Sequence, residues 1–390
     1  MATDFDKVIN RRGTHSLKYD FATVRGKKAD ILPLWVADMD FQAPKAVRDR
    51  LQEIVEHGVF GYSDTLEDYF DAVKSWYKRR FGWEIESDWI IKTPGIVFAL
   101  AMAVKAYTEP GESVLMLQPV YYPFSEVIED NGRKLVGSPL KLEDGHYSID
   151  FEDMEKKIQE NDVKLLLFCS PHNPVGRVWK KEELQKVAEL CLKYHVTLVS
   201  DEIHSDLVYK GHKHQMMASI SKEAADITVT CTAPSKTFNV AGLQLSNIII
   251  SNPKLREKFQ HEVTAAGYSQ PNLMGMEACQ AAYESGEEWL EELLVYLQGN
   301  VDFVRDYLKR EIPKIKLIEP EGTYLLWLDC RELGLSVEEL EHVVVDKANL
   351  WLDPGFIFGA VGEGFERINI ACPRQTLKQA LNQLRDALRA

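Results

Sequence analysis

The sequence predicts an α/β protein built around a mostly parallel, doubly wound sheet. Short apolar runs rich in β-branched residues alternate with longer segments of helical periodicity over most of the chain. This alternation is typical of parallel strands joined by right-handed helical crossovers. From residue 287 onward the pattern changes to a mixture of strands and helices. We therefore expect a large domain with a parallel sheet and a smaller α+β domain.

The elements of the large domain follow from periodicity and from the positions of proline and glycine. Residues 1–32 are predicted to be an irregular arm, and Pro44 opens the first helix. Later helices are expected at residues 66–81, 96–107, 124–131 and 181–194. The expected strands are residues 89–92, 113–117, 133–139, 164–169, 196–200, 226–231 and 245–250.

The small domain is expected to begin with a long helix over residues 287–309. Three strands (316–318, 323–329 and 365–371) and two helices (336–347 and 374–389) are predicted to follow it. The N-terminal arm is expected to join this domain. The predicted domains are thus residues 1–45 (the arm and part of the small domain), 46–286 (the large domain) and 287–390 (the small domain).

Composition excludes several classes of partner. The chain has 390 residues, 45% of them hydrophobic, and a formal net charge of −14. Such an acidic balance argues against nucleic acid or an anionic membrane as a partner. The six cysteines form no CxxC pair, and no metal-spaced Cys/His cluster is present in the sequence. Without a signal-like start or a long apolar run, a cytoplasmic protein is expected.

Chemically capable residues follow five of the predicted strands. They are Thr93-Pro94-Gly95, Tyr121, Asn173, Asp201 and Lys236. Each one alone has an ordinary explanation, such as a surface lysine, a helix cap or a turn asparagine. Ligands of open α/β sheets, however, bind outside the carboxyl ends of the strands. Five such residues at one edge therefore predict a binding site.

Pyridoxal phosphate is the cofactor whose chemistry this set meets. Lys236, which is expected in a loop, would form the Schiff base with the cofactor aldehyde. Asp201 would keep the pyridine nitrogen protonated, because a carboxylate and an N–H⁺ stabilise each other. Tyr121 would stack on the ring, and Asn173 would donate to its O3′ oxygen.

The cofactor phosphate is expected at the start of the helix over residues 96–107. A strand, a glycine turn at Gly95 and a helix N-terminus leave free N–H groups, which bind phosphate well. We predict that the N–H groups of Ile96 and Val97 hold the phosphate together with Ser235.

Several motifs resemble those of class I and II aminotransferases, the pyridoxal phosphate enzymes of fold type I. The resemblance covers nearly the whole chain. It is carried by Ser170-Pro-His-Asn-Pro-Val-Gly176, Asp201-Glu-Ile-His204, Ser235-Lys236 and Ile370-Ala-Cys-Pro-Arg374. It implies a large domain with a mostly parallel seven-stranded sheet and a small α+β domain.

Further motifs resemble the MalY/PatB group of cystathionine β-lyases. They are Trp35-Val-Ala-Asp-Met-Asp-Phe41, Pro234-Ser-Lys-Thr-Phe-Asn-Val-Ala-Gly-Leu243, Glu321-Gly-Thr-Tyr-Leu-Leu-Trp-Leu-Asp329 and Phe365-Glu-Arg-Ile-Asn-Ile-Ala-Cys-Pro-Arg374. This resemblance implies that Lys236 both anchors the cofactor and moves the proton of the substrate Cα.

The resemblance also implies a set of substrate contacts. Arg374 would bind the substrate carboxylate in a bidentate pair, and Asn173 would support the same carboxylate. Ala37, Tyr121 and Tyr324 would line the substrate side of the site. Alternatively, Arg374 is an ordinary surface residue at the start of a helix, since Pro373 precedes it.

Tyr62 is expected to reach the cofactor phosphate from the neighbouring subunit, which would make a homodimer obligatory. Plain core packing is its alternative.

Two positions depart from the common transaminase pattern, with His204 in place of a tyrosine and Gln244 in place of a phosphate-binding arginine. We expect His204 to pair with Asp201 or to contact the cofactor.

The function implied is β-elimination from L-cystathionine or a related cysteine S-conjugate. The products would be a thiol such as homocysteine, pyruvate and ammonia, a reaction of methionine and cysteine metabolism. One alternative is an aminotransferase for neutral or aromatic amino acids. A second, of another class, is a regulatory protein that binds pyridoxal phosphate.

Overall fold

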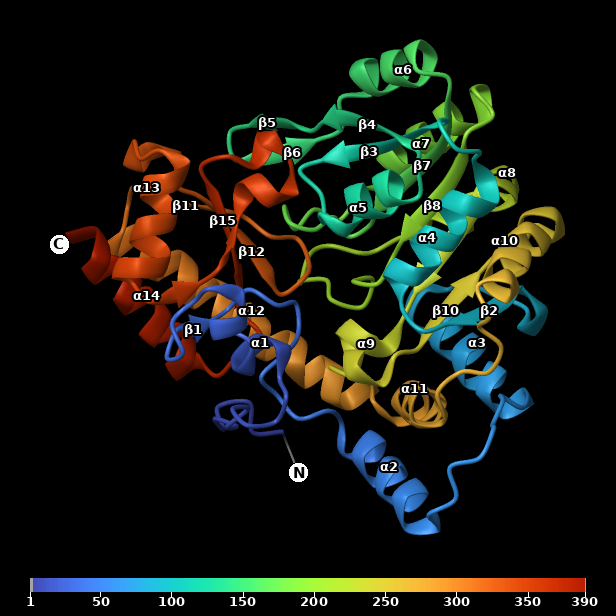
Figure 1. Ribbon diagram of the computed structural model, residues 1–390, viewed down its shortest axis with the longest axis horizontal. Coiled ribbons are helices and arrows are strands. Elements are labelled where there is room, and N and C mark those ends of the chain that lie inside the picture. The colour runs from blue at the N-terminus through green and yellow to red at the C-terminus, as the bar shows by residue number, and fades with distance from the viewer. Residues whose placement is uncertain (1–2, 390) are drawn as a thin grey trace.

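A computed structural model describes residues 3–389 of the chain. Its largest feature is a seven-stranded sheet with the strand order β2-β10-β9-β8-β7-β3-β4 (Figure 1). The pairs β9–β8, β8–β7, β7–β3 and β3–β4 are parallel, and β10 runs antiparallel to both of its neighbours. The strands are β2 (Ile90–Thr93), β3 (Ser113–Gln118), β4 (Lys134–Pro139), β7 (Val163–Cys169), β8 (Thr197–Asp201), β9 (Thr228–Thr232) and β10 (Ser246–Ile249).

Helices cover both faces of this sheet. Along β7, Leu165 and Leu167 belong to one hydrophobic cluster and Leu166 and Phe168 to another, so successive side chains are buried on opposite faces. The helices that follow the arm through this part of the chain are α2 (Lys45–His57), α3 (Glu67–Phe81), α4 (Ile96–Tyr107), α5 (Pro123–Asp130), α6 (Phe151–Glu160), α7 (Lys181–Lys193), α8 (Lys222–Ile227), α9 (Pro234–Thr237), α10 (Pro253–Ala265) and α11 (Leu273–Ser285).

A second, four-stranded antiparallel sheet lies toward the C-terminus, with the order β11-β12-β15-β14. Its strands are β11 (Lys316–Ile318), β12 (Leu325–Asp329), β14 (Asp353–Pro354) and β15 (Phe365–Asn369). The helices α12 (Glu287–Glu311), α13 (Val337–Glu341) and α14 (Arg374–Arg389) accompany it, and α12 passes between the two parts of the molecule (Figure 1). The arrangement confirms the predicted α/β fold with a smaller α+β part.

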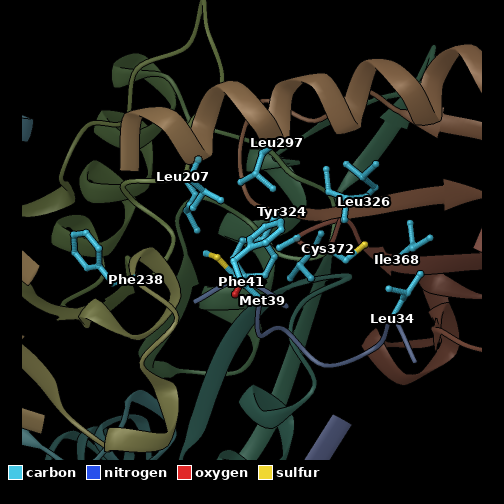
Figure 2. Close-up of a cluster of buried hydrophobic side chains, with 14 of the residues drawn as sticks. Leu34, Met39, Phe41, Leu207, Phe238, Leu297, Tyr324, Leu326, Ile368 and Cys372 are labelled. Atoms are coloured by element: carbon cyan, nitrogen blue, oxygen red, sulfur yellow. The ribbon is translucent and has the colours of Figure 1, made fainter. Parts of the chain in front are cut away.

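The N-terminal arm returns to this C-terminal part. It contains the short helix α1 (Leu17–Asp20), and β1 (Leu32–Pro33) pairs in parallel with β13 (Leu350–Trp351). Figure 2 shows Met39 and Phe41 beside Tyr324, within the cluster that also includes Leu297 of α12. The domain limits 1–45, 46–286 and 287–390 stay a prediction. The remaining two strands, β5 (Lys141–Glu143) and β6 (His146–Ser148), form a small antiparallel ribbon.

Several local expectations were wrong in their bounds, among them the strand expected over 323–329, which begins at Leu325. Residues 226 and 227 end helix α8, so β9 begins at Thr228. The helix expected over residues 336–347 is split, because a π-helical turn from His342 to Lys347 follows α13. Between residues 3 and 389, the structure contains no helix that combines the length and apolarity needed to cross a membrane.

Candidate active site

A cavity of about 480 Å³ opens at the carboxyl edge of the seven-stranded sheet. The residues that line it come from strand ends that are far apart in sequence. They include Ala37, Gly95, Ile96, Val97, Tyr121, Asn173, Asp201, His204, Ser235 and Lys236. Asn173 follows β7, Asp201 ends β8 and Lys236 follows β9. The structure thus brings together the residues that the sequence predicted at one edge.

Lys236 lies in the one-turn helix α9, which begins at Pro234, and not in the loop expected from the sequence. Its Nζ donates to the carbonyl oxygen of Ala37 at 2.6 Å. Burial lowers the pKa of the Lys236 amine to about 8, the charge of Asp38 opposes this change, and the charge of Arg367 adds to it. A substantial fraction of the amine is therefore neutral near physiological pH, as a nucleophile or a base requires.

The lowered pKa of Lys236 predicts the pH at which its amine is acetylated. The neutral fraction of an amine rises as the pH passes upward through its pKa, so in the cofactor-free chain Lys236 should acetylate half-maximally near pH 8. Lys222, an exposed lysine with a raised pKa, is the control and should need a more alkaline pH. Pulse labelling followed by peptide mass spectrometry measures both. Equal midpoints for the two lysines would contradict the prediction.

Asp201 is a buried acid at the end of β8. Its Oδ1 accepts the Ile203 N–H at 3.2 Å. Burial raises the pKa of the carboxyl to about 7, and the Ile203 N–H and the charge of Lys236 oppose the rise. A cationic N–H placed against Asp201 would favour the ionised form. The protonated nitrogen of a pyridine ring is such a partner.

Asn173 meets an arginine that the sequence motifs did not single out. Its Oδ1 accepts from Arg367 Nη1 at 3.0 Å. Arg367 Nη2 donates to the Trp35 carbonyl at 3.0 Å and pairs with Asp353. The Nε of Arg367 is buried and has no hydrogen-bond partner among residues 3–389. A guanidinium held in this way is prepared to bind a planar anion.

Arg374, by contrast, lies elsewhere, and the expectation that it binds the substrate carboxylate is corrected. It begins α14, its Nε donates to Asn300 Oδ1 at 2.6 Å, and its guanidinium stacks 5.0 Å above the Phe303 ring. Both partners are on α12. Arg374 therefore ties α14 to α12, while Arg367, seven residues earlier on β15, bonds to Asn173, which lines the cavity.

Of the predicted phosphate donors, Ile96 and Val97 begin α4 and Ser235 lies in α9, and all three line the cavity. Gly95 precedes the helix in an extended conformation, and a side chain there would meet no atom within 4 Å. The first N–H groups of α4 therefore border open space in the cavity. Gln244 and Ser246 also line it, and Ser246 Oγ is buried without a partner in the described part of the chain. The donor set fits a phosphate.

Three further predicted residues have definite positions. The Tyr324 hydroxyl donates to the Ala37 carbonyl at 2.8 Å. The His204 ring lies edge-on to Tyr324 at 6.0 Å, and burial followed by the charge of Lys236 lowers the His204 pKa to about 3. Within residues 3–389, His204 Nδ1 has no partner, so the expected pairing with Asp201 is not formed. Tyr62 is 99% exposed and does not line this cavity.

Comparison with known proteins agrees with this site. The family model described as "Aminotransferase class I and II" matches residues 29–384. The cystathionine β-lyase PatB of Bacillus subtilis is 46% identical, over 99% of this chain and 100% of its own length. Protein MalY of Escherichia coli is 32% identical, over 99% of both chains.

Among solved structures, cystalysin of Treponema denticola, which contains a pyridoxal 5′-phosphate cofactor, superposes with a TM-score of 0.96. It is 42% identical, and the match covers 100% of this chain and 99% of that one. The fold and the family expected from the sequence are thereby confirmed. The chain belongs to the class I and II aminotransferase family, and within it to the MalY/PatB group.

Proposed function

We propose that this protein is a pyridoxal phosphate-dependent carbon–sulfur lyase that cleaves L-cystathionine or a related cysteine S-conjugate by β-elimination. The expectations of this cofactor and of a carbon–sulfur lyase agree with the family and with its close relatives. The observation that carries the proposal is the buried amine of Lys236, which shares one cavity with Asp201 and Asn173. The choice of sulfur amino acid is our own step.

The residues fit the cofactor in five ways. When bound, pyridoxal phosphate supplies an electron sink that stabilises a carbanion at the substrate Cα. Lys236 would anchor it and then take the Cα proton, for which a pKa near 8 is well suited. Asp201 would pair with the ring nitrogen, Tyr121 would cover the ring and Asn173 would donate to O3′. Ile96, Val97 and Ser235 would hold the phosphate.

Arg367 takes the role that was expected of Arg374. We propose that its guanidinium binds the substrate α-carboxylate and that Asn173 fixes its orientation through the 3.0 Å hydrogen bond. Because Asp353 already neutralises one side of Arg367, the substrate carboxylate would use the remaining donors, among them the unpartnered Nε. Ala37 and Tyr324 would border the side chain of the substrate.

A single assay tests the proposal. Purified protein loaded with pyridoxal phosphate is given L-cystathionine or an S-alkylcysteine, and pyruvate and free thiol are measured. We expect equal amounts of both products. Glutamate formation from 2-oxoglutarate without any thiol would identify an aminotransferase instead. Binding of the cofactor with no turnover of any amino acid would favour a regulatory protein.

A homodimer is the second part of the proposal. Exposed apolar side chains gather on α2 and on the segment between α2 and α3: Val55, Val59, Phe60, Tyr62 and Leu66. Such a patch marks an interaction surface, and a second copy of the chain is the partner we propose. Tyr62 would then extend into the partner's site and contact the phosphate.

A cytoplasmic location is also proposed, since all six cysteines are buried and free.

Mixing two variants tests the shared site. Tyr62→Ala and Lys236→Ala should each be weakly active or inactive alone. If Tyr62 serves the partner's site, a mixed dimer carries both lesions in one site and none in the other, so activity should return on mixing. Refolding the two together and measuring pyruvate shows this. Mixtures no more active than the separate variants would place Tyr62 in its own subunit's site or outside the mechanism.

A further inference from the structure

The segment Val36–Asp40, here called the strap, crosses the active site without regular secondary structure. Its Ala37 carbonyl accepts two hydrogen bonds, from Lys236 Nζ at 2.6 Å and from the Tyr324 hydroxyl at 2.8 Å. The position of the Lys236 amine therefore depends on where the strap is held.

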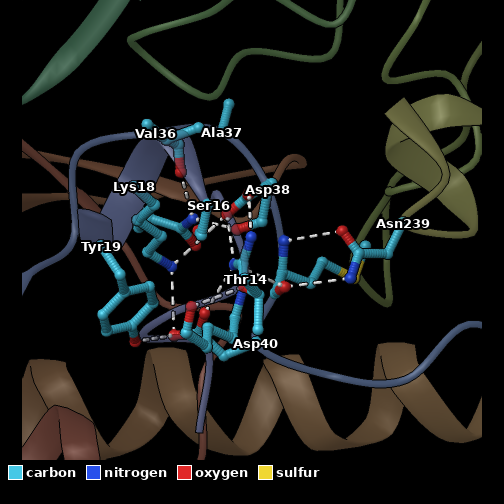
Figure 3. Close-up of polar contacts among 12 residues, drawn as sticks. Thr14, Ser16, Lys18, Tyr19, Val36, Ala37, Asp38, Asp40 and Asn239 are labelled. Carbon is cyan, nitrogen blue, oxygen red and sulfur yellow. Dashed lines mark hydrogen bonds and ion pairs between the residues drawn. The ribbon is translucent and has the colours of Figure 1, made fainter. Parts of the chain in front are cut away.

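Two asparagines fasten the strap from the site side. Asn239, three residues after Lys236, accepts the Met39 N–H at 2.9 Å and donates to the Met39 carbonyl at 2.9 Å (Figure 3). Asn369, two residues after Arg367, donates to the carbonyls of Val36 and Asp38, both at 2.6 Å. The strap is thus bound to the lysine segment at one point and to the arginine strand at another.

On the other side of the strap, Arg11 and Lys18 of the N-terminal arm pair with the strap's own Asp38 and Asp40. We call these four residues the charge cluster, and Figure 3 labels Lys18, Asp38 and Asp40 among them. Arg11 binds Asp38 at 2.6 Å and Asp40 at 2.8 Å. Lys18 binds Asp40 at 3.1 Å and lies 3.6 Å from Asp38. Two cations from the N-terminal arm therefore neutralise two carboxylates of the strap.

The charge cluster is buried more deeply than a surface ion network. The side chains of Lys18 and Asp40 are 0% and 4% exposed. Tyr19 adds a hydrogen bond to Asp40 Oδ2 at 2.9 Å. Charges taken so far out of water need matched partners in fixed positions, because an unpaired one is costly. Such a network can fix one geometry of an otherwise irregular backbone.

We propose that the charge cluster positions the Lys236 amine for proton transfer by holding the Ala37 carbonyl in place. The N-terminal arm would in this way be part of the active site without touching the substrate. A second cavity, of about 580 Å³, shares Ala37 and Lys236 with the active site and is lined by Arg11 and Asp38. Without the charge cluster, the strap could move into this space and leave Lys236 without its acceptor.

Asp38 of the strap also acts on the Lys236 amine through its charge. The groups that act on the Lys236 charge are Asp38, Arg367 and Asp201, with neutral His204 beside them. Asp38 favours the protonated amine, so it opposes the effect of burial. Its carboxylate keeps this position because Arg11 holds it. The proposal rests on Lys236 acting as the proton carrier in the proposed function.

Hydrogen exchange of the cofactor-loaded protein tests the inference directly. Arg11→Met removes the cation that bonds to both strap carboxylates. The amides of Asp38, Met39 and Asp40, all hydrogen-bonded here, should then exchange about tenfold faster. Turnover should slow by about tenfold in kcat, with less than about a twofold change in KM, since only the position of the base is affected.

The neighbouring arginine supplies a matched control. Arg12 donates to the carbonyls of Ala29 and Ile31 and makes no contact with the strap among the described residues. Arg12→Met should therefore leave strap exchange and kcat within about twofold of the parent. Arg11→Lys, which keeps the charge, should recover part of both properties. Lys18 is avoided because its side chain is fully buried, whereas that of Arg11 is partly exposed, so its loss would also disturb packing.

Three outcomes would overturn the inference. They are unchanged strap exchange in Arg11→Met, faster exchange without any loss of kcat, and equal effects of the two arginine variants. Because hydrogen exchange is measured without turnover, it reports on the strap even if the protein proves to catalyse another reaction.

Discussion

Replacing Lys236 by alanine is expected to abolish lyase activity, with a loss on the order of 10³-fold or more in kcat. The same substitution should remove the covalent link to the cofactor and with it the absorbance of the loaded protein near the visible edge. The reason is that a single buried amine at the sheet edge, bonded to Ala37, would serve as both anchor and proton carrier.

Two controls test whether the loss of activity and absorbance is specific to Lys236. Lys222→Ala removes an exposed lysine whose partner is Asp226, four residues along the same helix, and should leave activity and absorbance unchanged. Borohydride reduction of the parent protein should fix the cofactor on the peptide that contains Lys236. Stable labelling of another lysine, or turnover near the parent rate in Lys236→Ala, would contradict the assignment.

The sequence was sufficient for the fold and for most of the site because both depend on local patterns. The parallel strands are continuous apolar runs, and the residues that follow them meet at one edge whatever the details of packing. The pattern alone therefore predicts that Asn173, Asp201 and Lys236 lie together. Lys236 was expected in a loop, however, and the start at Pro234 turned that loop into one helical turn.

Ser246 was missed because of strand direction. In a parallel strand, the residues at the start lie far from the ligand edge. β10 is antiparallel, so its first residue, Ser246, pairs with Thr93 at the end of β2 and lies at that edge. A strand's direction is set by how it packs with its neighbours, and the periodicity of a single strand does not record it.

The strap was also beyond sequence reasoning. The motif Trp35–Phe41 contains two aspartates, Asp38 and Asp40, but the motif does not identify their partners. Their partners, Arg11 and Lys18, lie in an arm without periodicity. Pairing between an irregular arm and an irregular strap leaves no repeating signal, because each contact is set by tertiary packing alone.

Arg367 and Arg374 show how a motif can be recognised while the wrong residue in it is chosen. Both belong to the stretch Phe365–Arg374, and each is a plausible partner for a carboxylate. The end of β15 at Asn369 decides between them, because only Arg367 lies on the strand. Arg367 pairs across the sheet with Trp327 on one side and Asp353 on the other, which places it beside Asn173. Arg374 has left the sheet and begins α14.

Substitution of Arg367 should therefore lower kcat/KM strongly, whereas substitution of Arg374 should have little effect on it. Arg367→Met is expected to lower kcat/KM by roughly 10²-fold to 10³-fold, or about 3–4 kcal/mol of transition-state binding, because it removes a buried donor set for the substrate carboxylate. Arg374→Met should change kcat/KM by less than about threefold, since only the contact between α14 and α12 is lost. Steady-state kinetics with L-cystathionine measures both.

Loss of Arg367 also leaves Asp353 buried without its cation, so a folding defect has to be separated from a binding defect. The double variant Arg367→Met/Asp353→Asn removes both charges together and should restore thermal stability without restoring kcat/KM. A substrate analogue that lacks the α-carboxylate adds a second check, because it should be turned over equally by the parent and by this variant. If Arg374→Met lost activity and the Arg367 variants kept it, the carboxylate would have to bind on the α12 side, and the site geometry derived from Asn173 would be wrong.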